Sequence, residues 1–269
     1  MTSDAHSQAA VVPLWLWMLV LAPFIGSFLG VVLRRDSAGR SWLWQRSACE
    51  SCGTSLAARD LLPIVSFAVL RGRCRHCGSA ISWFHPGIEV ASLAVAFWAI
   101  SAAHGAWLVA SCCLGWVLVA LTCSDLVSYR LPDILTLSLL VGGLIMTAVL
   151  MPAAMLDHAL AAAVAYLGFR LIDEVYLRLR GQSGLGQGDA KLVAAAGAWL
   201  GLAALPYLIL LAAVVALTVL LGLRLGGVAI HARSRLPFGP FLSLATWLLW
   251  LYASSDVFKL SPYLLPVLK

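Results

Sequence analysis

Long apolar runs separated by short polar segments dominate the chain. Most of them are long enough to cross ~30 Å of hydrocarbon as a helix that rises about 1.5 Å per residue. The eight runs lie at 13–33, 88–103, 106–124, 134–151, 156–176, 190–203, 205–223 and 238–253, and those at 88–103 and 190–203 are short. The pattern predicts an all-α polytopic membrane protein with about eight transmembrane helices.

The composition agrees with this pattern. The 269 residues are 62% hydrophobic and only 11% charged, and the mean hydropathy is +0.93, which excludes an ordinary soluble domain. The first run is too long for a removable signal peptide, and it lacks a basic start and a small-residue cleavage site. We therefore expect it to remain as the first helix.

The net charge of +6 follows the predicted topology. Sixteen of the 18 Lys and Arg residues fall in the polar segment 34–86 or near alternate helix ends, and only Lys259 and Lys269 fall on the other side. The positive-inside rule then places the N-terminus outside and the polar segment in the cytosol. We expect contact with membrane lipid and no nucleic-acid partner, and the sequence does not indicate an oligomeric state.

The polar segment divides the chain into three parts. These are an outer tail with the first helix (1–33), a small cytosolic domain (34–87) and a membrane domain of about seven helices (88–269). The small domain contains four of the seven cysteines, in the sequences C-E-S-C and C-R-H-C.

Two Cys-x-x-Cys knuckles at this spacing match tetrahedral ligation of zinc by thiolates. A glycine directly after each knuckle gives the turn the backbone freedom that it needs. Two disulfides are the alternative, and a cytosolic location argues against them. We expect one structural zinc ion, which contributes much of the folding energy of this short domain; its ligands would be Cys49, Cys52, Cys74 and Cys77.

Two aspartates lie where apolar runs meet the predicted cytosolic boundary. Asp125 follows the third run, and Asp189 opens the sixth in the sequence G-Q-G-D-A-K-L. Ionisable groups in spanning segments are costly and are therefore functional candidates. Two carboxylates held together share a proton, so that one acts as a base on water and the other as an acid. This is the chemistry of aspartic peptide hydrolysis, and we predict that both residues are catalytic.

Several neighbours of Asp189 and Asp125 are candidates for active-site support. Glycines before the sixth helix keep the backbone irregular and let another chain approach. A lysine after Asp189 biases the sharing of the proton or extends to the membrane interface. The aspartates also have a simpler interpretation, because Asp is favoured at helix N-caps, above all after a proline. The supporting candidates are Gly186, Gly188, Lys191 and Asp133.

Six segments together resemble a known family. They occur in the order G-S-F-L-G-V-V (26–32), D-L-L-P-I-V-S-F (60–67), L-R-G-R-C-R-H-C (70–77), S-D-L-V-S-Y-R-L-P-D-I-L-T-L (124–137), G-Q-G-D-A-K-L (186–192) and R-L-P-F-G-P-F-L (235–242). The chain resembles the bacterial type IV prepilin peptidases, which are GxGD-type membrane aspartic proteases. The resemblance aligns Asp125 and Asp189 with the two catalytic aspartates of the family.

The resemblance implies an activity and a location. Members remove the basic leader from type IV prepilins or type II secretion pseudopilins at the cytosolic face of the bacterial inner membrane. Many also methylate the new N-terminal residue with S-adenosylmethionine, an activity associated with the cytosolic loop. Here W-F-H-P-G-I-E lacks the Arg and Tyr common in the family but keeps a proline and Glu89. The resemblance makes Glu89 a candidate contributor to methylation, and an interfacial charge at a helix start is its alternative role.

Two other functions share some of these features. A GxGD protease of presenilin or preflagellin type has the same aspartates, but its members generally lack the four-cysteine loop. A zinc-stabilised membrane transporter or scaffold would use Asp125 and Asp189 as ion or proton ligands.

Overall fold

The predicted apolar runs all form helices. The computed structural model describes residues 12–37, 47–181, 184, 186–227 and 236–253. The long helices are α1 (Leu14–Ser37), α3 (Phe84–Ala102), α4 (Gly105–Ser128), α5 (Asp133–Leu150), α6 (Met155–Arg180), α7 (Gln187–Leu200), α8 (Leu205–Leu225) and α9 (Gly239–Ala253). Short elements are η1 (Ala58–Leu61), α2 (Val65–Val69), η2 (Pro152–Ala154) and η3 (Leu202–Ala204). The all-α membrane architecture is confirmed.

Six of these helices are long and apolar enough to cross a membrane, and α7 and α9 are shorter. The run at 88–103, which looked short, belongs to the 19-residue helix α3. Helix α3 begins at Phe84 because Pro86 lies in its first turn, where a proline costs no hydrogen bond. Helix α4 continues to Ser128, so Asp125 lies inside its last turn and does not follow it.

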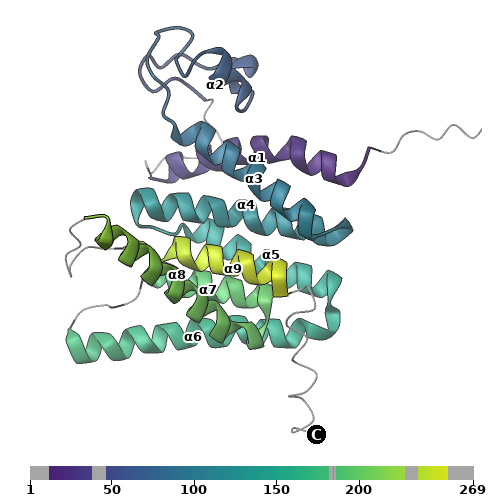
Figure 1. Ribbon diagram of the computed structural model, residues 1–269, viewed down its shortest axis with the longest axis vertical. Helices are drawn as coiled ribbons and strands as arrows, with labels where there is room; N and C mark the ends of the chain where they lie inside the picture. The colour runs from purple at the N-terminus through teal and green to yellow at the C-terminus, as the bar shows by residue number, and fades with distance from the viewer. Residues whose placement is uncertain (1–11, 38–46, 182–183, 185, 228–235, 254–269) are drawn as a thin grey trace, which may run out of the picture.

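The helices pack side by side in one bundle, and the cysteine-containing segment lies next to α1 and α3 at the top of the view (Figure 1). Helix α1 packs against α3, and α4 contacts α1, α3, α5 and α9. Helix α7 lies among α5, α6 and α9, and α8 packs on α9. Helix α7 is therefore surrounded by other helices, and its residues from Leu192 to Trp199 are all buried.

The candidate residues gather at one end of this bundle. Because consecutive helices alternate in direction, α1, α4, α6 and α8 end on the side where α3, α5, α7 and α9 begin (Figure 1). The last turns of α1, α6 and α8 carry Arg34, Arg35, Arg178, Arg180 and Arg224. The prediction that basic residues share one face is therefore confirmed for these side chains. Arg40, Arg46, Arg233, Arg235, Lys259 and Lys269 lie outside the described residues.

Small residues let α7 approach its neighbours closely. A Cβ atom on Gly197 would lie 2.9 Å from the backbone of Ala161 in α6, and one on Gly143 of α5 would lie 2.6 Å from the Trp199 ring. The indole nitrogen of Trp199 donates a 2.8 Å hydrogen bond to the carbonyl of Leu139. Close backbone contact and interhelical hydrogen bonds are typical of helix association in membranes.

Hydrogen bonds, some of them buried, hold the end of α7 at the opposite end of the bundle. Nδ1 of His158 lies 2.9 Å from the carbonyl oxygen of Ala198 and 3.2 Å from the hydroxyl of Thr147. The carboxylate of Asp157 accepts a 3.0 Å hydrogen bond from the backbone N–H of Leu202. These contacts fix the position of α7 along the bundle axis.

The close packing predicts opposite effects of the same substitution at two glycines. Gly197→Ala forces a Cβ into the backbone of α6, and we expect a loss of about 1–3 kcal/mol in stability. Gly168→Ala in α6 meets no atom within 4 Å, so the usual helical preference for Ala should stabilise that variant by about 0.5–1 kcal/mol. Unfolding of both variants in mixed detergent micelles measures the difference. Equal stabilities would contradict this account of the α6–α7 contact.

Candidate active site and metal centre

The four predicted metal ligands come together in two turns of the same shape. The N–H of Gly53 donates to the carbonyl of Cys49, and the N–H of Gly78 donates to that of Cys74, both at 2.9 Å. Both glycines have a φ of +70°, a conformation that glycine adopts without strain. The role expected for these glycines is confirmed.

The sulfur atoms have the spacing of a tetrahedral metal site. The four Sγ atoms lie within 4.8 Å of one another, and those of Cys49 and Cys77 are 3.9 Å apart. Zinc–sulfur bonds of ~2.3 Å place tetrahedral sulfurs about 3.8 Å apart, so the residues fit this ion. All seven cysteines are free, and the disulfide alternative is not found in the described structure.

Local hydrogen bonds favour the thiolate form of Cys49 in this cluster. Backbone N–H groups of Cys52 and Ser51, together with the hydroxyl of Ser79, lower the pKa of the Cys49 thiol to about 6. Metals bind thiolates rather than thiols, so this environment suits a metal ligand. Residues Cys49, Cys52, Cys74 and Cys77 therefore form a cluster that can hold a metal ion.

An ion pair stabilises the small domain, and a buried carboxylate of α3 ties the domain to the bundle. Arg75 donates a 2.8 Å hydrogen bond to Asp60 and so lowers the pKa of that carboxyl group. Glu89, buried in α3, accepts a 2.7 Å hydrogen bond from the backbone N–H of Ile64 and a second from the hydroxyl of Ser27 in α1. Glu89 is therefore not a solvated interfacial charge. It connects α1, α3 and the small domain.

Asp125 is buried at the end of α4 and faces the start of α9. Its carboxylate accepts a 2.9 Å hydrogen bond from the backbone N–H of Gly239. A Cβ atom on Gly239 would lie 2.7 Å from the same carboxylate oxygen. Only glycine at this position lets the first turn of α9 approach Asp125 so closely.

Asp189 lies in the first turn of α7 and is half-buried. Its carboxylate bonds to the backbone N–H of Gly186, which is the N-cap residue. Asp189 therefore occupies the third helical position, as the acidic residue of a capping box does, and its interpretation as the N-cap itself is wrong. A Cβ atom on Gly186 would lie 2.8 Å from the carboxylate, so a glycine here leaves room for the Asp189 side chain.

The loop between α4 and α5 connects the two aspartates. The side chain of Leu131 would lie 2.9 Å from a Cβ atom on Gly188 and 3.3 Å from one on Gly239. Leu131 thus packs between the helix turn that holds Asp189 and the one that hydrogen-bonds Asp125. Through Leu131, the loop therefore links the turn that carries Asp189 with the first turn of α9, whose Gly239 bonds to Asp125.

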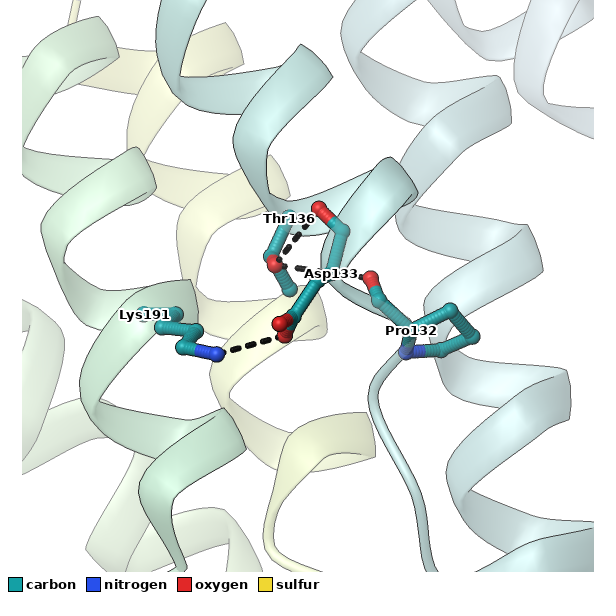
Figure 2. Close-up of polar contacts among 4 residues, drawn as sticks. All are labelled: Pro132, Asp133, Thr136 and Lys191. Atoms are coloured by element: carbon teal, nitrogen blue, oxygen red, sulfur yellow. Dashed lines mark hydrogen bonds and ion pairs between the residues drawn. The ribbon is translucent and has the colours of Figure 1, made fainter.

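Figure 2 shows the second pair of charged residues at this end of the bundle. Nζ of Lys191 in α7 lies 2.5 Å from a carboxylate oxygen of Asp133 at the start of α5 (Figure 2). The N-cap of α5 is Pro132, and Asp133 makes no capping hydrogen bond, so its predicted role as a cap is wrong. Its partner is instead a lysine that lies two residues after Asp189 along the chain.

The sequence did not predict two contacts that hold the site. One is the hydrogen bond from Gly239 to Asp125, although the segment F-G-P at 238–240 stood out as a motif. The other is a 3.1 Å hydrogen bond from the backbone N–H of Gly184 to the buried carboxylate of Asp173 in α6, which anchors the approach to α7. Both join segments that are distant in sequence, so no local pattern indicates them.

Comparison with known proteins places the chain in a family. Residues 20–103 match the family model described as bacterial peptidase A24 N-terminal domain, and residues 112–221 match the type IV leader peptidase family. The first match covers the small domain with its flanking helices, and the second covers the helices that carry Asp125 and Asp189. No solved structure matches the chain significantly.

Similar proteins extend over most of the chain. A prepilin leader peptidase/N-methyltransferase from Aeromonas hydrophila is 36% identical, with 90% of this chain and 92% of the relative covered. Proteins of the same name from Burkholderia pseudomallei strain 1026b and Dickeya chrysanthemi are each 38% identical, covering 84% and 85% of this chain and 81% and 89% of the relatives. With both domain matches in order and this coverage, the chain belongs to the type IV leader peptidase family.

Proposed function

We propose that this chain is a membrane aspartic endopeptidase that removes the basic leader from type IV prepilins or type II secretion pseudopilins. We also propose that it methylates the amino group that cleavage exposes. The observation that carries the proposal is the similarity, over most of the chain, to proteins named prepilin leader peptidase/N-methyltransferase. Membership of a peptidase family argues against the transporter and scaffold alternatives.

Asp125 and Asp189 are the catalytic pair in this proposal. One carboxylate takes a proton from a water molecule, which attacks the peptide carbonyl, while the protonated partner donates to the carbonyl oxygen. The hydrogen bonds from Gly239 and Gly186 support this assignment of the catalytic pair, because each fixes the orientation of one carboxylate. Repulsion between the two groups favours the state with one shared proton.

In this proposal, the ion pair between Lys191 and Asp133 helps to hold the catalytic aspartates in position. It joins the first turns of α5 and α7, and both side chains are partly exposed, so its contribution to stability is small. Its role is to position the turn that carries Asp189, with Gly186 and Gly188 allowing close approach of the surrounding segments.

The small domain would hold a structural zinc ion through Cys49, Cys52, Cys74 and Cys77. Glu89 would contribute to methylation by holding this domain against α1 and α3. S-adenosylmethionine would supply the methyl group.

The proposed orientation follows from charge. The arginines at the ends of α1, α6 and α8 lie on the side of the bundle where the small domain and both aspartates lie. The positive-inside rule makes this the cytosolic side of the bacterial inner membrane, and the N-terminus then lies outside.

Removing either carboxylate tests the catalytic pair. Asp125→Asn and Asp189→Asn cannot share the proton, and we expect each to slow leader removal about 100-fold or more. Asp157→Asn is the matched control at the opposite end of the bundle, since its amide oxygen still accepts the hydrogen bond from Leu202. Mass spectrometry of a co-expressed prepilin measures cleavage. Near-wild-type processing by either variant would show that the assignment is wrong.

Loss of one thiolate tests the metal centre. We expect about one zinc ion per purified wild-type chain and a large loss of it in Cys49→Ser, with the small domain becoming sensitive to protease. Cys113→Ser, at an exposed position of α4, should retain the metal. Elemental analysis and limited proteolysis give the two readouts. A wild-type protein purified without chelator and free of zinc would refute the proposed ligand set.

A further inference from the structure

A pocket of about 460 Å³ opens between the small domain and the bundle. Its volume lies in the range of small-molecule sites, about 300–1,000 Å³. It lies at the end of the bundle that holds the aspartates, and α4 lines it with residues on both sides of Asp125 along the chain. Its walls are formed by the ends of α1 and α4, the start of α3 and the first cysteine knuckle. The lining residues are Leu33, Arg34, Glu50, Ser82, Phe84, Cys123, Ser124, Val127 and Ser128.

The pocket combines both signs of charge with an aromatic ring. Arg34 and Glu50 form an ion pair, and the Glu50 side chain is 72% exposed, so its carboxylate is accessible. The Arg34 guanidinium carbon lies 5.7 Å from the centroid of the Phe84 ring. The face of this ring can therefore interact with a cation. Leu33 and Val127 add apolar walls.

This set of groups fits a ligand that joins an amino acid, with its ammonium and carboxylate groups, to a planar nucleobase. A guanidinium group binds a carboxylate in bidentate fashion, and a carboxylate binds an ammonium group. An aromatic face attracts a sulfonium, and the apolar wall suits an adenine ring. The hydroxyls of Ser82 and Ser128 lie on the same lining and are of the kind that bonds to a ribose.

We propose that this pocket is the binding site for S-adenosylmethionine, with Arg34 and Glu50 holding its amino-acid end and Phe84 facing its sulfonium. The inference rests on the proposed methyltransferase activity and assigns it a place. When bound, the donor supplies a methyl carbon. The lone pair of the substrate amine forms the new C–N bond, and the C–S bond breaks with its electrons going to sulfur. The methylated nitrogen takes the positive charge.

The position of the pocket also explains how one chain performs both reactions. Ser124 and Ser128 line the pocket from the last turns of α4, and Asp125 belongs to the same turns. Ser128 donates to the carbonyl of Ser124, and Ser124 donates to that of Arg130, so these hydroxyls hold the end of α4 in place. An amino terminus released beside Asp125 would lie close to the methyl donor without leaving the protein.

A second pocket, on the surface of α3, does not fit this ligand. It measures about 560 Å³ and lies along α3, lined by Val90, Leu93, Ala94, Phe97 and Trp98. Its lining has no charged side chain to bind a carboxylate or an ammonium group, and unpaired polar groups of a ligand would be costly there.

Filling the pocket gives the sharpest test, because α4 offers two adjacent exposed residues of which one lines the pocket. Val127 lines the pocket, whereas Leu126 does not, and their exposed fractions are 69% and 56%. We expect Val127→Trp to weaken binding of S-adenosylhomocysteine to the purified full-length protein about tenfold or more, and Leu126→Trp to leave it unchanged. Isothermal titration calorimetry in detergent measures the affinity. Wild-type affinity in Val127→Trp, or no binding by the wild type, would overturn the proposal.

A charge substitution tests the same site without adding bulk. Glu50→Gln removes the partner of the ligand ammonium, and we expect a loss of about tenfold in affinity for the same probe. Glu174→Gln is the matched control, because Glu174 forms an exposed ion pair with Arg178 at the same end of the bundle, outside the pocket. An equal loss of affinity in both variants would overturn the assignment of Glu50.

Mass spectrometry of a co-expressed prepilin separates this inference from the proposed function. We expect Val127→Trp to yield substrate that is cleaved but largely unmethylated. Full methylation by this variant would overturn the pocket assignment and leave the proposed function intact. A wild-type enzyme that cleaves without methylating would refute the methyltransferase half of the function and the pocket with it, and failure of the wild type to cleave would refute the peptidase.

Discussion

Close helix contact at glycine is the constraint on which the rest of the structure depends. In hydrocarbon, apolar side chains gain little from contact with one another, so helices associate through close packing and hydrogen bonds. Helix α7 carries Asp189 and approaches α6 at Gly197 and α5 at Gly143, where a Cβ atom would collide with a neighbour. Helix α9 approaches Asp125 at Gly239 in the same manner. The positions of both carboxylates follow from these contacts.

The hydrogen bonds of the two aspartates show how the bundle accommodates charge at its edge. A buried carboxylate is costly unless polar groups bond to it. Asp125 accepts a hydrogen bond from the N–H of Gly239, and Asp189 accepts one from the N–H of Gly186. Each carboxylate therefore uses a backbone donor at a helix N-terminus, where the helix dipole favours negative charge. These donors leave other lone pairs of each carboxylate available to water or substrate.

The small domain is positioned by few contacts, and each has a clear cause. Two cysteine knuckles shape one half of it, and the Asp60–Arg75 ion pair joins its helical turn to the second knuckle. Glu89 then attaches the domain to the bundle through Ile64. In a domain with so small an apolar core, a metal bound by the cysteine cluster would contribute much of the folding energy. Its position at the end of the bundle that holds the aspartates brings its charged residues close to the proposed peptidase site.

The sequence alone determined the helical architecture and the cysteine cluster, and it singled out Asp125 and Asp189 as candidates, because these depend on local features: hydrophobic length, cysteine spacing and short motifs. It did not determine what Asp133 contacts, since an aspartate after a proline has the same local pattern whether it caps a helix or pairs with Lys191. Nor did it show that Gly239 bonds to Asp125 or that a pocket forms beside α4. Those features join residues from different helices, and only the packing of the bundle decides which side chains meet.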